Sequence, residues 1–167
     1  MAHDGPKDVN TAWTDGHFAL FVLADVSNED LGRVLDEAYD GSGEYYYWLA
    51  DDWSNAPRDG EDATKPPIAE DWRSPFQKKT VDDVVAFMKK IPEDRYIDYH
   101  HFAVLDEDFT KRRLVTIYRI GNEDLVGDEL DALPCSVAGS TLFLSSMNSH
   151  YWEETKANYP EKGEPVG

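Results

Sequence analysis

The pattern of apolar and polar residues in the first fifty positions predicts a strand, a helix and a second strand. Residues 18–24 form a continuous apolar run with the length of a strand that is covered on both faces. Ser27 and Asp30 have the spacing of a helix capping box, and apolar residues then recur with the helical period over 28–39. The aromatic run 45–50 is typical of a second strand.

The following segment, 51–79, is rich in proline and charge and has no period, so it predicts a long irregular loop. Loops of this length are uncommon in compact domains and often carry function. Thr80 and Asp83 then repeat the capping-box spacing at the start of the most regular amphipathic stripe in the chain. The apolar residues of this stripe are Val81, Val84, Val85, Met88 and Ile91.

The C-terminal half continues the alternation of strands and helices. Residues 101–105 and 114–118 are strand-like runs joined by a short polar stretch, which predicts a hairpin. Cap and stop signals predict a helix over 122–133, a short strand over 141–144 and a last helix from 148 or 149 to 158. The order β-α-β-loop-α-β-β-α-β-α favours an α/β (α+β) fold, with a single mixed sheet of about five strands and about four helices.

The size of the chain suits one domain. With 167 residues, of which 41% are hydrophobic, it can bury a full core but has little length for two. We expect a flexible N-terminal arm over 1–16, a single α/β domain over 17–159 and a frayed tail over 160–167.

The net charge of the chain limits the kinds of molecule that we expect it to bind. The chain has 34 acidic and 16 basic residues, which gives a formal net charge of −18. This balance excludes nucleic acid as an expected partner, because affinity for a phosphate backbone comes from lysine and arginine. The acidity fits three interpretations: simple solubility, adaptation to high salt, or an acidic face that docks on a basic protein.

Several features predict a cytoplasmic protein that does not enter a membrane. The longest apolar run, 18–24, is far shorter than the roughly 20 residues that cross a bilayer. Asp4, Asp8 and Asp15 stand where a signal peptide would carry positive charge. The single cysteine, Cys135, allows no intrachain disulfide, which favours a reducing compartment.

The candidate catalytic residues are Asp98, His100 and His101, because imidazole and carboxylate groups act as general bases and metal ligands. Side chains alternate along a strand, so only one of the two histidines could share a face with Asp98. The alternative is that both histidines lie at the start of a strand and have no catalytic or metal-binding role. No zinc-ligand spacing, nucleotide-binding motif or hydrolase nucleophile motif occurs in the chain, so we expect no metal and no cofactor.

Cys135 is a conceivable nucleophile that the sequence argues against. It follows the predicted acidic helix 122–133, and a helix C-terminus and nearby acids both raise the pKa of a thiol. We therefore expect a partly buried residue that fills space.

Five aromatic residues are the candidate binding residues. They cluster in sequence around the second strand and the long loop, and exposed tyrosine and tryptophan are favoured anchors of interfaces and ligand clefts. The alternative is that some face the core while the rest brace the loop. These residues are Tyr45, Tyr47, Trp48, Trp53 and Trp72.

Several short segments of the chain resemble an uncharacterised family of small acidic microbial proteins. Residues 136–148 and the Trp-Glu-Glu of 152–154 are similar to the strand and helix that close the chain in that family. Residues 20–25 and the hairpin around 104–106 also fit its layout. The resemblance implies a single α/β domain and carries no known activity.

Two hypotheses for function follow. The first is a non-catalytic protein-interaction protein, such as an inhibitor or immunity-type partner of a basic protein. The second is a small enzyme or small-ligand-binding protein with a cleft under the loop 51–79, in which His100 or His101 would act as base. A deep pocket beneath the loop that contains a histidine and a second polar group would favour an enzyme, and a flat aromatic patch ringed by acidic residues would favour the first hypothesis.

Overall fold

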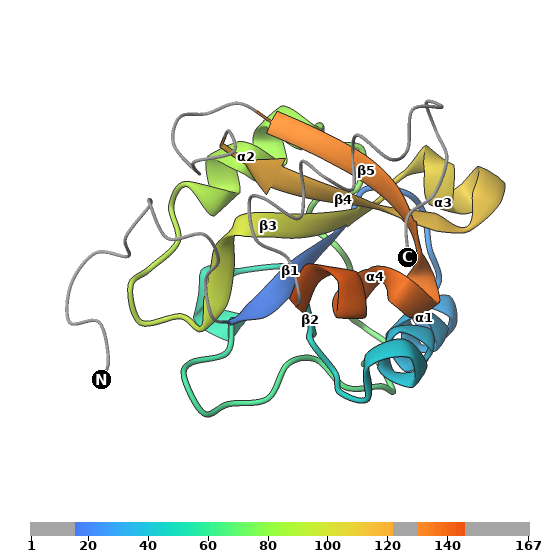
Figure 1. The fold of residues 1–167 in the computed structure, drawn as a ribbon, viewed down its shortest axis with the longest axis horizontal. Helices are drawn as coiled ribbons and strands as arrows, with labels where there is room; N and C mark the ends of the chain where they lie inside the picture. The colour runs from blue at the N-terminus through green and yellow to red at the C-terminus, as the bar shows by residue number, and fades with distance from the viewer. Residues whose placement is uncertain (1–15, 122–129, 146–167) are drawn as a thin grey trace.

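The computed structural model describes residues 16–121 and 130–145, which form one mixed five-stranded sheet with helices packed on it (Figure 1). The strands are β1 (His17–Val22), β2 (Tyr47–Leu49), β3 (Ile97–Leu105), β4 (Leu114–Ile120) and β5 (Leu130–Ser136). The helices of this described part are α1 (Asn28–Ser42), α2 (Val81–Met88), α3 (Glu107–Arg112) and α4 (Val137–Ser145), with a 3-10 turn, η1 (Trp53–Asn55). The predicted fold class is confirmed.

The order of strands across the sheet is β2-β1-β3-β4-β5. β1 pairs in parallel with both β2 and β3, and β3, β4 and β5 pair antiparallel in turn. The chain leaves β1 toward β2 on one side and later crosses to β3 on the other. In open sheets of this kind, ligands bind beyond the carboxyl ends of the strands, next to the point where the order reverses.

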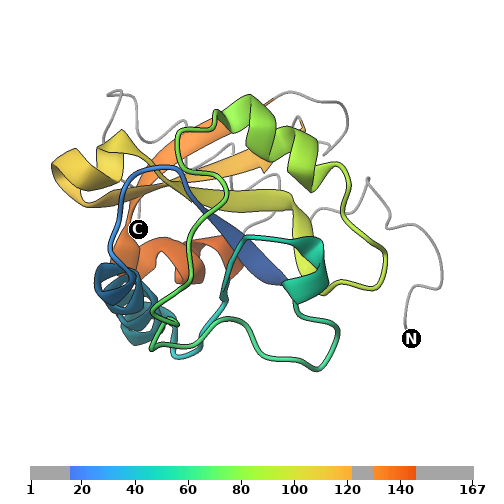
Figure 2. The same cartoon turned by 180° about the vertical axis from the view of Figure 1, so that it is seen from behind.

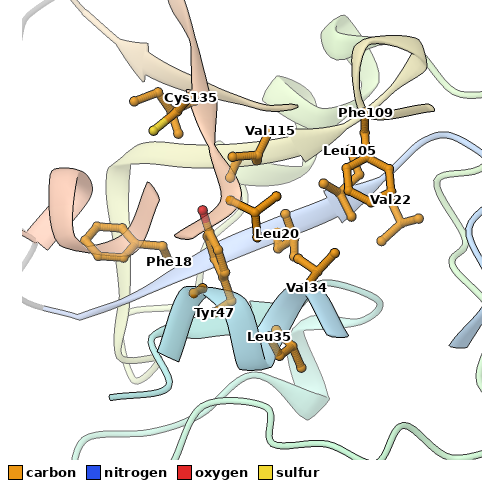
Figure 3. Close-up of a cluster of buried hydrophobic side chains, with 14 of the residues drawn as sticks. Phe18, Leu20, Val22, Val34, Leu35, Tyr47, Leu105, Phe109, Val115 and Cys135 are labelled. Carbon is orange, nitrogen blue, oxygen red and sulfur yellow. The ribbon is translucent and has the colours of Figure 1, made fainter. Parts of the chain in front are cut away.

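Each face of the sheet buries its own hydrophobic layer, because side chains of a strand point alternately to the two faces. Leu20 and Val22 belong to the layer under α1 and α4, and Phe21 belongs to the layer under α2. Figures 1 and 2 show these helices on opposite sides of the sheet. Figure 3 shows Leu20, Val34 and Tyr47 gathered between the sheet and α1.

The starts of α1 and α2 are where the capping boxes predict them. The Ser27 hydroxyl accepts a hydrogen bond from the Asp30 amide at 3.1 Å. At α2 the box is reciprocal: the Asp83 amide donates to the Thr80 hydroxyl at 3.2 Å, and the Thr80 amide donates to the Asp83 carboxylate at 2.9 Å. α1 runs three residues beyond its predicted end and stops at Gly43, whose φ of 86° suits glycine.

Residues 122–129 of the predicted helix 122–133 lie outside the described residues. For residues 130–133 the prediction is wrong, because residues 130–136 form strand β5. β5 pairs along its whole length with β4, and this pairing outweighs the local helix signals. Pro134 is tolerated because β5 is at the edge of the sheet, where a missing amide need not break a ladder hydrogen bond.

The predicted strand 141–144 is also wrong, because these residues lie in α4. A short apolar run fits a buried helix as well as a strand, and here contacts with α1 decide between them. The Thr141 hydroxyl donates to the Ala38 carbonyl at 3.2 Å. The two helices approach so closely that a methyl group at Gly41 would lie 1.5 Å from the Ala138 carbonyl oxygen.

The predicted hairpin of 101–105 and 114–118 is confirmed by the antiparallel pairing of β3 with β4. Its connection contains the short helix α3. The predicted arm up to residue 15, the last helix and the tail lie outside the described residues. Within the described residues, no helix combines the length and the apolar composition that crossing a membrane requires.

Candidate functional site

The long loop 51–79 is irregular apart from η1, and its second half is held against the start of α1 and the end of β1. The Asn28 side-chain amide donates to the carbonyl oxygens of Ala69 at 2.9 Å and Trp72 at 3.0 Å. The Ser74 hydroxyl donates to the Val22 carbonyl at 2.7 Å. In Figure 2 this green part of the loop runs beside the blue segment that follows β1.

A cavity of about 1030 Å³ lies between α1 and the 66–77 stretch of the loop. We call it the cleft. It begins beyond Val22, at the carboxyl end of β1, which is where parallel sheets of this topology place their ligands. The second of the two sequence-based hypotheses placed a cleft under the loop, and this cavity lies beside the second half of that loop.

Carboxylates outnumber cations in the cleft. Its four carboxylates belong to Asp25, Glu29, Asp36 and Glu70, and its two guanidinium groups to Arg33 and Arg73.

The two cations of the cleft are engaged within the protein. Arg33 forms ion pairs with Glu29 and, at 3.6 Å, with Asp30. Arg73 donates to the backbone carbonyl oxygens of Glu70 at 2.9 Å and of Trp72 at 2.8 Å. The cleft therefore presents a negative potential to a ligand, in a protein whose net charge is also strongly negative.

Two partly exposed aromatic side chains line the cleft, Tyr45 and Trp72. The Tyr45 hydroxyl donates to the Asp36 carboxylate at 2.8 Å, and this hydrogen bond raises the pKa of Tyr45. The Trp72 indole donates to the Asp51 carboxylate at 3.0 Å. Aromatic faces beside carboxylates are suited to organic cations, which both groups attract.

The other three predicted binding residues lie elsewhere. Tyr47 is 1% exposed and its hydroxyl donates to Ser140 at 2.8 Å within the core. Trp48 is 4% exposed, so neither ring is available on the surface. Trp53 is partly exposed on the opposite face of the sheet, where it stacks on Phe87 at 4.6 Å. Of the five, only Tyr45 and Trp72 line the cleft, while the buried Trp48 lines a smaller cavity together with Trp72.

Asp98, His100 and His101 form a buried polar cluster at an irregularity in β3. One Asp98 carboxylate oxygen accepts from the His100 amide at 2.8 Å and the His101 amide at 3.0 Å. It also lies 3.4 Å from the His101 ring nitrogen Nδ1, so His101 is the histidine that faces Asp98. Burial lowers the pKa of His100, which keeps its ring neutral at pH 7.

None of these three residues lines the cleft. Their exposed fractions are 4% or less, and Asp98 uses its carboxylate to hold the backbone of the strand irregularity. The geometry supports the interpretation that both histidines are structural residues of the strand.

Cys135 is completely buried in β5, and burial raises the pKa of its thiol to about 12. The sequence also predicts a raised pKa for this thiol, but the cause in the structure is burial and not a helix C-terminus. A thiol of this kind is inert as a nucleophile near neutral pH.

Within the described ranges, 16–121 and 130–145, no group of three or more histidine, cysteine, aspartate or glutamate side chains is arranged to hold a metal ion. Comparison of the chain with protein-family models, curated proteins and solved structures found no match. The resemblance to the family of small acidic microbial proteins stays a prediction.

Sequence reasoning missed most polar residues of the cleft. Asp25, Asn28 and Asp36 belong to the β1–α1 region, whereas Glu70 and Arg73 come from the loop. The only available signal was local: polar residues that directly follow a predicted parallel strand often line a site.

Proposed function

We propose that this protein is a non-catalytic binding protein, of inhibitor or immunity type, that docks a basic segment of a protein partner in the cleft. The observation that carries the proposal is the composition of the cleft. Its carboxylates exceed its cations by two, and one of the two cations, Arg33, is already paired with Glu29.

The net charge of the whole chain supports the same kind of partner. A charge of −18 attracts a basic protein over a distance comparable to the Debye length, which is about 8 Å at physiological ionic strength. Such attraction mainly raises the association rate, while contacts in the cleft supply specificity. Tyr45 and Trp72 offer aromatic surface against which the stem of a lysine or the guanidinium of an arginine can pack.

The position of the histidines favours binding over catalysis. The enzyme hypothesis offered His100 or His101 as a base in the cleft, and neither residue lines it. A small-ligand-binding protein is the second candidate, because a volume near 1000 Å³ is also found in sites for small molecules. The same carboxylates would then select an organic cation.

A cytoplasmic location is part of the proposal. Cys135 is a free, buried thiol, and the described residues are held together without a disulfide. Such a protein suits a reducing compartment, where disulfides rarely persist.

Calorimetric titration with a lysine- and arginine-rich peptide of about ten residues tests the proposal. Each of the variants Asp36→Asn and Glu70→Gln should weaken binding about two- to fivefold, as expected for a solvent-accessible charge pair. The matched control is Glu93→Gln, which removes the same charge at an exposed residue that does not line the cleft.

Equal weakening by all three variants would mean that only net charge matters, and the cleft would lose its assigned role. Tight binding of a small polyamine, with no further gain from the peptide, would favour the second candidate.

A further inference from the structure

Two further cavities adjoin the cleft, one on each side. A cavity of about 320 Å³ lies at the carboxyl end of β2 and shares Pro67, Ile68 and Trp72 with the cleft. A cavity of about 460 Å³ lies between the start of α1 and α3, and shares Asp25, Val26 and Ser27 with the cleft. The three cavities therefore follow one another beyond the carboxyl ends of β2, β1 and β3.

The balance of charge changes along this row. The β2-side cavity is lined by Asp51, Asp62 and Lys65, and Lys65 is paired with Asp62 at 3.1 Å. Together with the cleft, this part of the row carries an excess of carboxylates.

The α3-side cavity has the opposite balance. Lys111, Arg112 and Arg113 line it, against Asp25 and Asp30.

The cations at the α3 end differ in how firmly they are held. Arg113 pairs with Asp30 at 3.1 Å and with Glu37 at 2.6 Å. Arg112 is held by two hydrogen bonds to the Asp108 carboxylate, at 2.7 Å and 2.8 Å. Lys111 pairs at 3.5 Å with Glu107, and both side chains are more than 70% exposed. Exposed ion pairs of this kind contribute little, so Lys111 can turn toward a bound partner.

We infer that the three cavities together form one groove for an extended segment of the partner, with its basic side chains over the cleft and the β2-side cavity and an acidic side chain beside Lys111. The inference rests on the proposed function and adds the length and the charge order of the bound segment. It follows from charge complementarity along the row and from a total space larger than one small-molecule site.

Shared lining residues make the row of cavities continuous, which suits an extended segment. Trp72 lines both the β2-side cavity and the cleft, and Val26 lines both the cleft and the α3-side cavity. In an extended chain, successive side chains point in opposite directions at a rise of about 3.3 Å per residue. The backbone can then follow the row while every second side chain enters a cavity, as in other grooves that bind extended peptides.

Selection from a library of random 12-residue peptides against the full chain tests the inference. We expect the selected peptides to group lysine and arginine toward one end and to place an aspartate or glutamate toward the other. Against a Lys111→Glu variant, the basic group should remain and the preference for an acidic residue should be lost.

One selected peptide then gives a quantitative check that does not depend on a charge reversal. Its acidic residue is replaced by the amide, and binding to the wild type should weaken about two- to fivefold. The same replacement should have no effect on binding to a Lys111→Gln variant whose melting temperature matches the wild type.

The possible failures are distinct. No enrichment of basic residues overturns both the proposed function and this inference. Only the inference is overturned if the selected peptides are basic and depend on Asp36 and Glu70, but have no acidic preference. The same holds if their acidic preference is unchanged in the Lys111 variants.

Discussion

Asn28→Ala should release the loop from the start of α1 and weaken the roof of the cleft. The Asn28 amide makes two hydrogen bonds of good length, to Ala69 at 2.9 Å and Trp72 at 3.0 Å, and a longer one to Glu70 at 3.4 Å. These contacts join residues more than 40 positions apart, so no neighbouring residue can replace them.

The size of the effect follows from these bonds. Each of the two short bonds contributes about 0.5–1.5 kcal/mol net. Alanine in the first turn of α1 recovers about 0.5 kcal/mol of helix propensity, and water can reach part of the freed carbonyl groups. The expected loss is therefore about 1–2 kcal/mol of unfolding free energy. For a chain of 167 residues this lowers the melting temperature by roughly 2–6 °C.

Circular dichroism melting measures the loss, and amide hydrogen exchange of residues 66–77 locates it. Faster exchange should be confined to this stretch. Asn55→Ala is the control, because the Asn55 amide makes one exposed hydrogen bond, to Asp51 at 3.3 Å within the same loop. If Asn28→Ala melted like Asn55→Ala and exchange in the loop were unchanged, the assigned role of Asn28 would be refuted.

Three further predictions concern the core. Val84→Asp should lower the free energy of unfolding by several kcal/mol and Val85→Asp by clearly less, because Val84 is fully buried and Val85 is partly exposed. Equal losses for the two variants in urea unfolding would contradict the packing of α2. His100 is held neutral by burial, so its contribution to stability is present above pH 6.5 and is lost as the pH falls toward its lowered folded pKa. His100→Gln should therefore lose less stability than the wild type between pH 7 and pH 5, and an identical pH profile would show that other groups cause the loss. Cys135 should not react with a thiol reagent at pH 8 until the protein is denatured, and rapid reaction of the native protein would contradict its burial.

Part of the candidate site could be predicted from the sequence. The length of the loop 51–79 indicated a cleft beneath it, and Tyr45 and Trp72 were among the expected binding residues. Tyr47 and Trp48 could not be separated from them by sequence, because aromatic residues suit both a buried strand and an exposed surface. Burial alone distinguishes the two cases.

The sequence by itself determined the elements whose signals are local. The capping boxes of Ser27 and Thr80 act within one helical turn, so α1 and α2 begin where their residues predict. β1 is apolar on both faces because both faces are covered, and this also is visible in the sequence.

Tertiary structure decided the elements and contacts whose partners are distant in the chain. Residues 130–136 form a strand because β4 supplies a complete pairing edge, and residues 137–145 form a helix that packs on α1 at Gly41. The cleft has the same origin, since its carboxylates meet only after Asn28 and Ser74 have joined the loop to α1 and β1. Local propensities differ by less than about 1 kcal/mol per residue, and long-range pairing and burial of a whole segment outweigh them.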